Sequence, residues 1–580
     1  MSTRPPPGYE SIAKIRQHLR KPNSFAYLRL DPFALETDHW ELRSSQVLGA
    51  INNLDGLNHG LESRFKEGQD FTREIQRCVS ELWPTLVLWL DFLHPMHHAG
   101  TSRHERVPMQ TICRMLFYLF NTTGLIEEMR SRTARLYDML FLIWLRFDEY
   151  QTTSCMAYPS FTGIAEAVRQ SMWIAGKGFA DNLNGDMLAN YPAMVAQNMS
   201  PHCLPAALGA VRNRPRAFYR QALRQTRHFI DITKATRPSS ISGVEDHVIA
   251  VAEFASELLP LEVHAKDVVV GFVDVVRSIR SIPNLRSVAI MVCSVLHAMW
   301  RSSTDGRPLV WSIRRGIMAS ILKLHMEENS SQLVGLTRLV SLQGSQVNVL
   351  RALDKEEVSL RNLGAGAPEE QDRLDYWMKE RIRALRQFYG TKCANEECPS
   401  PDPSSAKFRC PCFNACYCSK TCQKIDRQSH KSYCVNGTKG PSYRTVDGPE
   451  VSPRDGHFVA SLTWKIINDH AQTIVVAIQR AQLRDPPVGK DYQLLFNVAD
   501  MIPRIAVNPL NRAEEKWNSS CGGIPICASI TFAGSATRLY IIHIKMTELA
   551  DTAKQRVAEG YPEEGLEYLI HLPVTQYKYY

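Results

Sequence analysis

The sequence predicts a mainly α-helical protein that also carries a small cysteine-rich segment and, towards residue 580, a small unit of mixed α and β structure. Three observations support this fold class. Apolar residues recur at spacings of three and four over more than two hundred and fifty residues, as they do in helices that bury one face. Eight of the fifteen cysteines lie between Cys393 and Cys434. After about residue 490, short runs rich in branched and aromatic residues replace the helical spacing, and such runs are typical of strands.

Residues 1–363 are predicted to form a long helical array. The clearest helix covers 71–93, where Ile75, Val79 and Leu82 belong to a series of apolar residues along one face, although Pro84 can kink or divide it. Further stretches share this spacing and cover 107–120, 125–147, 161–174, 191–197, 215–234, 243–259, 261–279, 285–299, 308–326 and 332–342. Many helices with short connections favour an array over a helix-and-sheet sandwich. A stack of the HEAT or armadillo type is one form that such an array can take, but no fixed repeat period emerges from the sequence.

The second half of the chain is predicted to hold four further segments. A Gly/Ala/Pro stretch at 364–368 precedes a connecting helix at 368–389, whose acidic start suits the first turn of a helix. The cysteine-rich segment follows at 393–434, and then a linker rich in Gly, Pro and Ser at 435–455. The last segment, 456–580, is predicted to be an α+β domain, with helices at 457–481 and 547–559 and strands at 492–498, 526–532 and 539–545.

Composition and charge are those of an ordinary globular protein. The net charge of +9 is small for 65.8 kDa and weakly favours acidic partners, but no run of consecutive Lys and Arg is present, so nucleic acid is not an expected partner. The start of the chain lacks the apolar core of a secretory signal, and the longest apolar run, 287–300, is too short to span a bilayer. We therefore expect an intracellular protein, cytoplasmic or nuclear, without a membrane partner. In such a reducing compartment, clustered cysteines are metal ligands more often than disulfides.

The cysteine-rich segment contains nine candidate metal ligands, which are Cys393, Cys398, Cys410, Cys412, Cys416, Cys418, Cys422, His430 and Cys434. A segment this short buries too little apolar surface to offset its ordering entropy, so we expect a bound ion to stabilise it. Tetrahedral zinc supplies that free energy directly. Two ions need eight ligands, which leaves one spare cysteine. The spacings Cys418-x3-Cys422 and His430-x3-Cys434 suit helices, because donors one helical turn apart can face one ion.

The run Tyr417-Cys418-Ser419, followed by Cys422-Gln423, His430-Lys431 and Cys434, resembles the MYND-type zinc finger. The resemblance covers residues 393–434, and all the spacings from Cys412 onward agree with the family at once. It implies two interleaved Zn²⁺ sites. One would be formed by Cys393, Cys398, Cys418 and Cys422, and the other by Cys410, Cys412, His430 and Cys434, with Cys416 as the spare cysteine.

Two features depart from the family pattern. The first two cysteine pairs are C-x4-C and C-x-C, where the family usually has C-x2-C, and Cys416 is therefore an alternative ligand to Cys410. Arg427 occupies a position where the family commonly has Trp, on a surface that some members use to bind proline-rich peptides. The presence of Arg427 in place of Trp alters the surface expected to bind peptides, but it does not alter the metal ligands.

A non-enzymatic protein is the favoured function class. The sequence contains no Gly-rich phosphate loop, G-x-S-x-G elbow or H-E-x-x-H helix, and a zinc with four protein ligands has no open position for catalysis. We expect a protein-interaction or adaptor protein that acts through its MYND-like finger and its helical array, with protein partners or peptide motifs as ligands. The alternatives are a zinc that only stabilises the fold, a transcription regulator of the corepressor type, and a protein methyltransferase, although the Asn-His-Ser-Cys-like run of MYND methyltransferases is missing.

Overall fold

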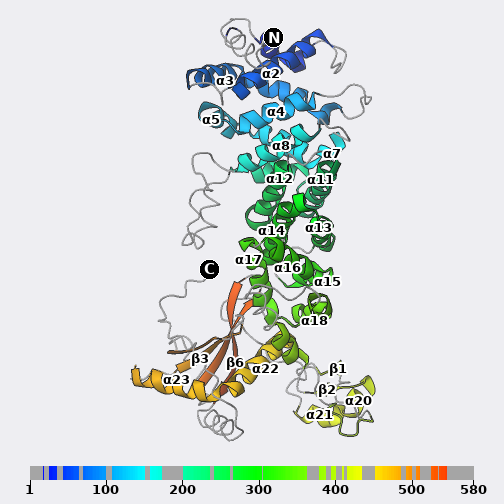
Figure 1. Ribbon diagram of the computed structural model, residues 1–580, viewed down its shortest axis with the longest axis vertical. Coiled ribbons are helices and arrows are strands. Elements are labelled where there is room, and N and C mark those ends of the chain that lie inside the picture. The colour runs from blue at the N-terminus through cyan, green and yellow to red at the C-terminus, as the bar shows by residue number, and fades with distance from the viewer. Residues whose placement is uncertain are drawn as a thin grey trace, which may run out of the picture. The chain divides into compact units, whose positions relative to one another are not determined.

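The computed structural model is mainly helical (Figure 1). It describes residues 17, 25–35, 44–63, 69–98, 108–150, 157–172, 200–235, 241–260, 265–303, 305–328, 330–361, 378–386, 393–399, 408–410, 415–433, 451–484, 492–498, 504–509, 524–532 and 535–544. Contacts divide the chain into two compact units. Unit 1 comprises Met1–Leu261 with Asp274–Ala298, and unit 2 comprises Glu262–Val273 with Met299–Tyr580. Among the described helices, none combines the length and the hydrophobicity that crossing a bilayer requires.

Unit 1 is built from helices that each bury an apolar face. They are α2 (Ser45–Ser63), α3 (Gln69–Phe92), α4 (Met109–Phe120), α5 (Leu125–Ser131), α6 (Ala134–Leu145), α7 (Phe147–Tyr150), α8 (Ala157–Met172), α10 (Cys203–Ala210), α11 (Pro215–Ala235) and α12 (Ser242–Glu253), which continues into a π-helical turn (Phe254–Leu258). Two more helices, α13 (Lys266–Ile279) and α14 (Arg286–Ser302), each contribute residues to both units.

A buried polar contact joins three helices in the core of unit 1. Trp144 of α6 and His247 of α12 are both fully buried. The indole N–H of Trp144 donates to Nδ1 of His247 at 2.9 Å, and Nε2 of His247 lies 2.9 Å from Oγ1 of Thr226 on α11. An indole nitrogen only donates, so the proton of the neutral imidazole is on Nε2. Burial lowers the pKa of His247 to about 3.

The helix α8 contacts both α4 and α12. Its approach to α12 depends on Gly243, the second residue of α12. A Cβ atom at Gly243 would lie 2.6 Å from Oγ1 and 2.8 Å from Cα of Thr162 on α8. Only glycine therefore allows the two helices to pack at this distance.

Unit 2 combines helices with two sheets. The helices are α15 (Arg307–Arg314), α16 (Ile317–Glu328), α17 (Ser331–Leu342), α18 (Val347–Arg361), α20 (Lys420–Ile425), α21 (Arg427–Tyr433), α22 (Pro453–Asp469) and α23 (Ala471–Arg484), with a further helical segment at 378–386. The strands are β1 (Phe408–Arg409), β2 (Cys416–Tyr417), β3 (Tyr492–Asn497), β4 (Arg504–Pro509), β5 (Ile524–Phe532) and β6 (Ser535–Ile544). β1 and β2 form a two-stranded sheet, and the other strands form a sheet of order β4-β3-β5-β6. Within it β3 and β5 are parallel and the outer pairs are antiparallel.

The helical segment at 378–386 is held to other parts of unit 2 by its arginines. Nη2 of Arg386 lies 2.6 Å from Oδ1 of Asp354 on α18. Arg381, whose side chain is buried, donates to the carbonyl of Val498 directly after β3. Burial lowers the pKa of Arg381 to about 10, and the guanidinium still carries its charge at neutral pH.

The predicted spacing locates most helices but misses some of their breaks. The predicted helix 125–147 is divided into α5, α6 and α7, and the predicted helix 308–326 is divided at Gly316. Its φ of 86° ends α15, because a left-handed residue cannot continue a right-handed helix. In contrast, α3 continues through Pro84. The predicted helices at 191–197 and 547–559 lie outside the described residues.

The predicted strands at 492–498, 526–532 and 539–545 correspond to β3, β5 and β6. The sequence analysis did not find β4. This strand is only six residues long and ends at Pro509, so it resembles a loop in sequence.

Candidate metal centre

A short hairpin forms the base of the cysteine-rich segment. β1 and β2 pair in antiparallel fashion, and the amide of Cys410, directly after β1, donates to the carbonyl of Ala415 at 2.9 Å. The amide of Ala394 donates to the carbonyl of Cys416 at 2.7 Å. This second bond ties the turn that carries the first cysteines of the segment to β2.

The N-terminal cap of α20 places two of the cysteines. Ser419 is the residue before the helix, and its hydroxyl oxygen accepts a hydrogen bond from the amide of Cys422 at 3.1 Å. The cap fixes the first helical turn, and the sulfur atoms of Cys418 and Cys422 consequently lie 3.4 Å apart. The backbone amide of Cys418 lies 3.5 Å from the sulfur of Cys393, so the chain also contacts a sulfur from the preceding turn.

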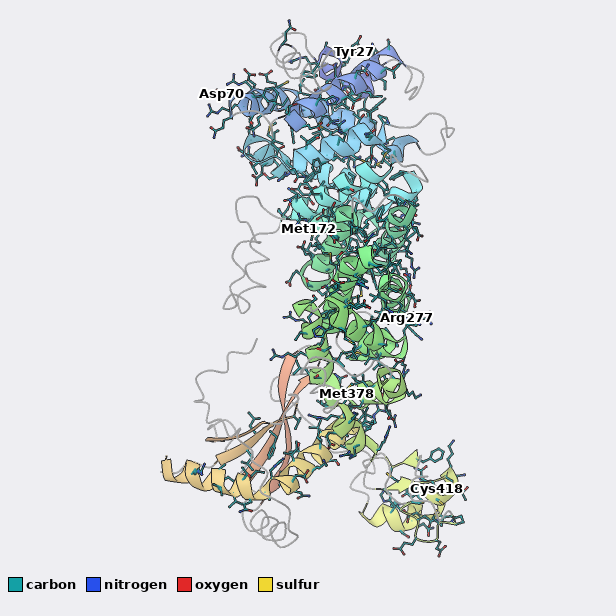
Figure 2. All side chains as sticks on the ribbon, viewed as in Figure 1. Tyr27, Asp70, Met172, Arg277, Met378 and Cys418 are labelled. Carbon is teal, nitrogen blue, oxygen red and sulfur yellow. The ribbon has the colours of Figure 1, made fainter. Side chains whose placement is uncertain are left out.

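Four cysteine sulfurs meet at this point. Those of Cys393, Cys398, Cys418 and Cys422 all lie within 4.8 Å of one another. The sulfur of Cys398 is 3.3 Å from that of Cys418 and 3.8 Å from that of Cys422. These separations are far longer than a disulfide bond of about 2.05 Å, and they approach the ~3.8 Å between two ligands of a tetrahedral ion with metal–sulfur bonds of about 2.3 Å. Figure 2 labels Cys418 at this centre.

Hydrogen bonds give the thiols of the centre different pKa values. Hydrogen bonding from Ser419 and from Asn395 lowers the pKa of the Cys422 thiol to about 6, and so favours its thiolate. Hydrogen bonding with the sulfurs of Cys398 and Cys422 raises the pKa of Cys418 to about 12. One thiolate therefore opposes the ionisation of its neighbours. A divalent cation removes this opposition, because its charge stabilises every thiolate that binds it.

A buried tyrosine supports the centre. Tyr417 is 1% exposed and packs with Ala415 and Cys422 in a small apolar cluster. Its hydroxyl donates to Oδ2 of Asp426 at 2.8 Å, and Asp426 is the residue between α20 and α21. The ring of Tyr417 also meets that of His430 edge-on, with 6.4 Å between the centroids. Tyr417 thus fixes the angle at which α21 follows α20.

The sequence analysis missed three residues that support the sulfurs. Ser419 has a sequence signal, since a serine three residues before Cys422 suits a helix N-cap. Asn395 and Asp426 have none, because their contacts depend on the path of the turn and on the angle between α20 and α21. Asn395 orders the first turn by accepting a hydrogen bond from the amide of Glu397 at 3.3 Å.

Three of the remaining five candidate ligands are described. Cys410 is half-buried after β1, Cys416 is buried in β2, and His430 is buried in α21. None of these three belongs to the group of four sulfurs. Cys412 and Cys434 lie outside the described residues, so the second predicted site stays a prediction.

The four cysteines could together hold one metal ion. A tetrahedral set of thiolates is typical of zinc and of iron sites. Four protein ligands also fill the coordination of such an ion and leave no position for water or substrate. This donor set suits a structural ion.

Comparisons with known proteins assign no family or function to this site. No protein-family model, no curated protein and no solved structure matches the chain.

Proposed function

We propose that this protein is a non-enzymatic adaptor in which Zn²⁺ stabilises a MYND-like finger that binds another protein. One observation carries the proposal, namely the convergence of the sulfurs of Cys393, Cys398, Cys418 and Cys422 from two separate turns of the chain. A segment with so small an apolar cluster gains little stability from burial, so the ion supplies the folding free energy. The finger then presents the surface of α20 and α21 to a partner.

Zinc is the ion that fits best. Four thiolates are soft ligands, and zinc accepts their tetrahedral arrangement without redox chemistry. We propose a second Zn²⁺ at Cys410, Cys412, His430 and Cys434, with Cys416 as the spare cysteine. The spacing of four between His430 and Cys434 supports this assignment, because it suits two donors one helical turn apart that face the same ion.

The exposed face of the finger contains an apolar side chain between cations. Ile425, at the end of α20, is 53% exposed, and Lys424 and Arg427 beside it are exposed as well. An exposed apolar residue flanked by positive charge fits a protein segment that offers an apolar anchor and carboxylates. Arg427 replaces the family's usual Trp here, so we expect a partner that pairs with its guanidinium.

Metal analysis tests the centre. Purified protein should contain two zinc ions per chain. Cys422→Ala and Cys410→Ala should each lose about one ion, and Cys416→Ala should keep both. A single zinc in the wild type would show that the second site does not exist. Loss of an ion from Cys416→Ala but not from Cys410→Ala would show that Cys416 is the ligand and Cys410 the spare cysteine. Iron in place of zinc, or almost no metal, would contradict the proposal.

Partner capture tests the recognition surface. The matched variants are Ile425→Ser on the finger and Leu125→Ser on α5, where Leu125 is a similarly exposed leucine in unit 1. We expect a partner captured by the wild type to be lost with Ile425→Ser and retained with Leu125→Ser, while the zinc content of both variants stays unchanged. If Ile425→Ser retains the partner, and the double variant Cys418→Ala, Cys422→Ala retains it as well, the zinc has a structural role alone.

A further inference from the structure

Exposed apolar side chains gather on the first elements of unit 1. Ten large apolar residues are exposed among those whose side chains the structure describes. Six of them lie within residues 25–98, which are fewer than a fifth of the described residues. This apolar surface consists of Tyr27, Leu30, Phe33, Leu48, Leu88 and Met96, each 36–48% exposed. The other four, Leu125, Met326, Ile425 and Val476, lie on four different helices, so no second group of this kind occurs among the described side chains.

Two glycines of α2 hold the first part of this surface in place. The 3-10 helix η1 (Ala26–Arg29) contacts α2, on which Gly49 and Gly56 lie two turns apart on one face. A Cβ atom at Gly49 would lie 2.5 Å from Cδ2 of Tyr27, and one at Gly56 would lie 3.4 Å from Cε1 of Phe25. The ring of Tyr27, labelled in Figure 2, is therefore packed directly on the backbone of α2.

The helix α3 holds the second part. The indole N–H of Trp89 on α3 donates to the carbonyl of Leu30 at 3.0 Å. In the next 3-10 helix, η2 (Pro32–Ala34), the ring of Phe33 meets that of Phe92 on α3 edge-on, with 5.7 Å between the centroids. These contacts fix the backbone and one ring of the segment that follows η1.

The remaining side chains lie beside these contacts. Leu48 is next to the glycine under Tyr27, and Leu88 lies one turn before Phe92 on α3. Met96 belongs to the short helix η3 (Pro95–His98), which follows the end of α3. Since η1 contacts both α2 and α3, and η2 contacts α3, the surface is formed by elements that pack on one another. A surface fixed in this way loses little conformational entropy when it binds.

The exposed area of the surface matches the apolar part of a standard interface. A large apolar residue has roughly 200 Å² of accessible area, so exposures of 36–48% leave roughly 500 Å² exposed over the six residues. A standard interface buries about 800 Å² on each partner, and roughly 60–65% of that area is apolar. The surface is thus large enough to supply the whole apolar part of one.

Charges of both signs lie beside the surface. Arg29 and Asp31 flank Leu30, and Nη2 of Arg29 lies 3.9 Å from Oε2 of Glu81 on α3. Asp31 also accepts a hydrogen bond from the amide of Phe33 at 2.9 Å. All three charged side chains are exposed. One cation and two carboxylates give little net charge, so the surroundings favour neither a strongly charged partner nor an anionic membrane.

We propose that the apolar surface joins two copies of this chain in a two-fold symmetric dimer. In such an interface each surface meets itself, and it must therefore be self-complementary. Apolar side chains meet apolar side chains, and the charges of both signs allow Arg29 of one copy to approach Asp31 or Glu81 of the other. The area and the charge pattern both fit this occupant.

Sedimentation velocity of the full-length, zinc-loaded protein from about 1 to 50 µM tests the proposal. The wild type should form a species of twice the chain mass of 65.8 kDa as the concentration rises. The double variant Leu30→Ser, Leu88→Ser should dimerise about tenfold more weakly or worse, because it removes two apolar side chains from the interface. The control Leu125→Ser, Met326→Ser changes two similarly exposed side chains elsewhere and should dimerise as the wild type does.

Charge reversal separates the interface from a folding defect. Arg29→Glu leaves only carboxylates beside the surface, and Glu81→Arg adds a second cation. Each variant alone should dimerise more weakly than the wild type, and a mixture of the two should form a mixed dimer more strongly than either forms its own. A folding defect in either variant would not be repaired by mixing.

Four outcomes would overturn the proposal. They are a wild type that stays monomeric at 50 µM, a dimer that Leu30→Ser, Leu88→Ser leaves unchanged, equal weakening by the two double variants, and a monomer that uses this surface to bind anionic phospholipid vesicles or a different protein. The surface is separate from the finger, because all six side chains belong to unit 1.

Discussion

At the scale of single residues, His247 makes the stability of the protein depend on pH. Its folded-state pKa of about 3 lies below the ordinary value of 6.5, because the imidazole is buried. Below pH 6.5 the unfolded chain gains a proton that the folded chain does not accept. The free energy of unfolding should therefore fall by up to about 1.4 kcal/mol per pH unit between pH 6.5 and pH 3.

His247→Gln tests this dependence. At pH 7 the variant should be less stable than the wild type, because it disturbs the contact with Trp144. As the pH falls to 4.5 the difference should shrink by about 2.5 kcal/mol, since the variant has no imidazole to protonate. Urea denaturation across this range measures it, with the exposed His59→Gln as control. A difference that is constant with pH would contradict the assigned titration.

The same scale shows how far sequence can identify a site. Cys418 and Cys422 were predicted to share an ion because a spacing of four places two donors on one helical side. The structure brings their sulfurs together, but only Cys422 lies in α20, and Cys418 precedes the N-cap Ser419. The roles of Asn395 and Asp426 follow from a turn and an interhelical angle, which no residue spacing encodes.

At the scale of helices, Gly243 should be the most sensitive glycine of α12 and α8. Gly243→Ala forces its Cβ against Cα of Thr162, and we expect a loss of about 1–3 kcal/mol in the free energy of unfolding. Gly209→Ala on α10 is the matched control, because a Cβ there meets nothing within 4 Å. It should stabilise the protein by about 0.5–1 kcal/mol through helix propensity. Equal effects from the two substitutions would show that α8 and α12 do not pack this closely.

The spacing of apolar residues locates the helices more closely than it locates the breaks between them. The spacing located α11 at 215–234, within one residue of its observed end. The breaks at Gly316 and between α5 and α6 were missed, because apolar spacing continues across both.

At the scale of the whole molecule, removal of the metal should unfold the finger and leave the helices of both units intact. α20 and α21 have six and seven residues, a small share of all the residues in the described helices, so a chelator should lower the far-ultraviolet helical signal by only about 5%. Trypsin should then cleave quickly at Lys420 and Lys424, and added zinc should restore protection. A large loss of helical signal on chelation would show that the ion stabilises more than the finger.

The division into units follows from packing, and the sequence did not predict it. The sequence places a boundary near residue 364, where Gly, Ala and Pro interrupt the helices. Contacts instead group α15 to α18 with the C-terminal sheet and helices. Long-range partners of this kind, such as Asp354 and Arg386, carry no local signal.

The anchored helical segment at 378–386 also sets how far the finger can travel. Seven peptide units separate Arg386 from Cys393, and a fully extended chain of that length spans at most about 25 Å. Any molecule bound to the finger is thus confined to a small volume around α18 and the end of β3, where its effective concentration reaches the millimolar range. A second, weak contact with the body of unit 2 would then need little affinity of its own to be occupied.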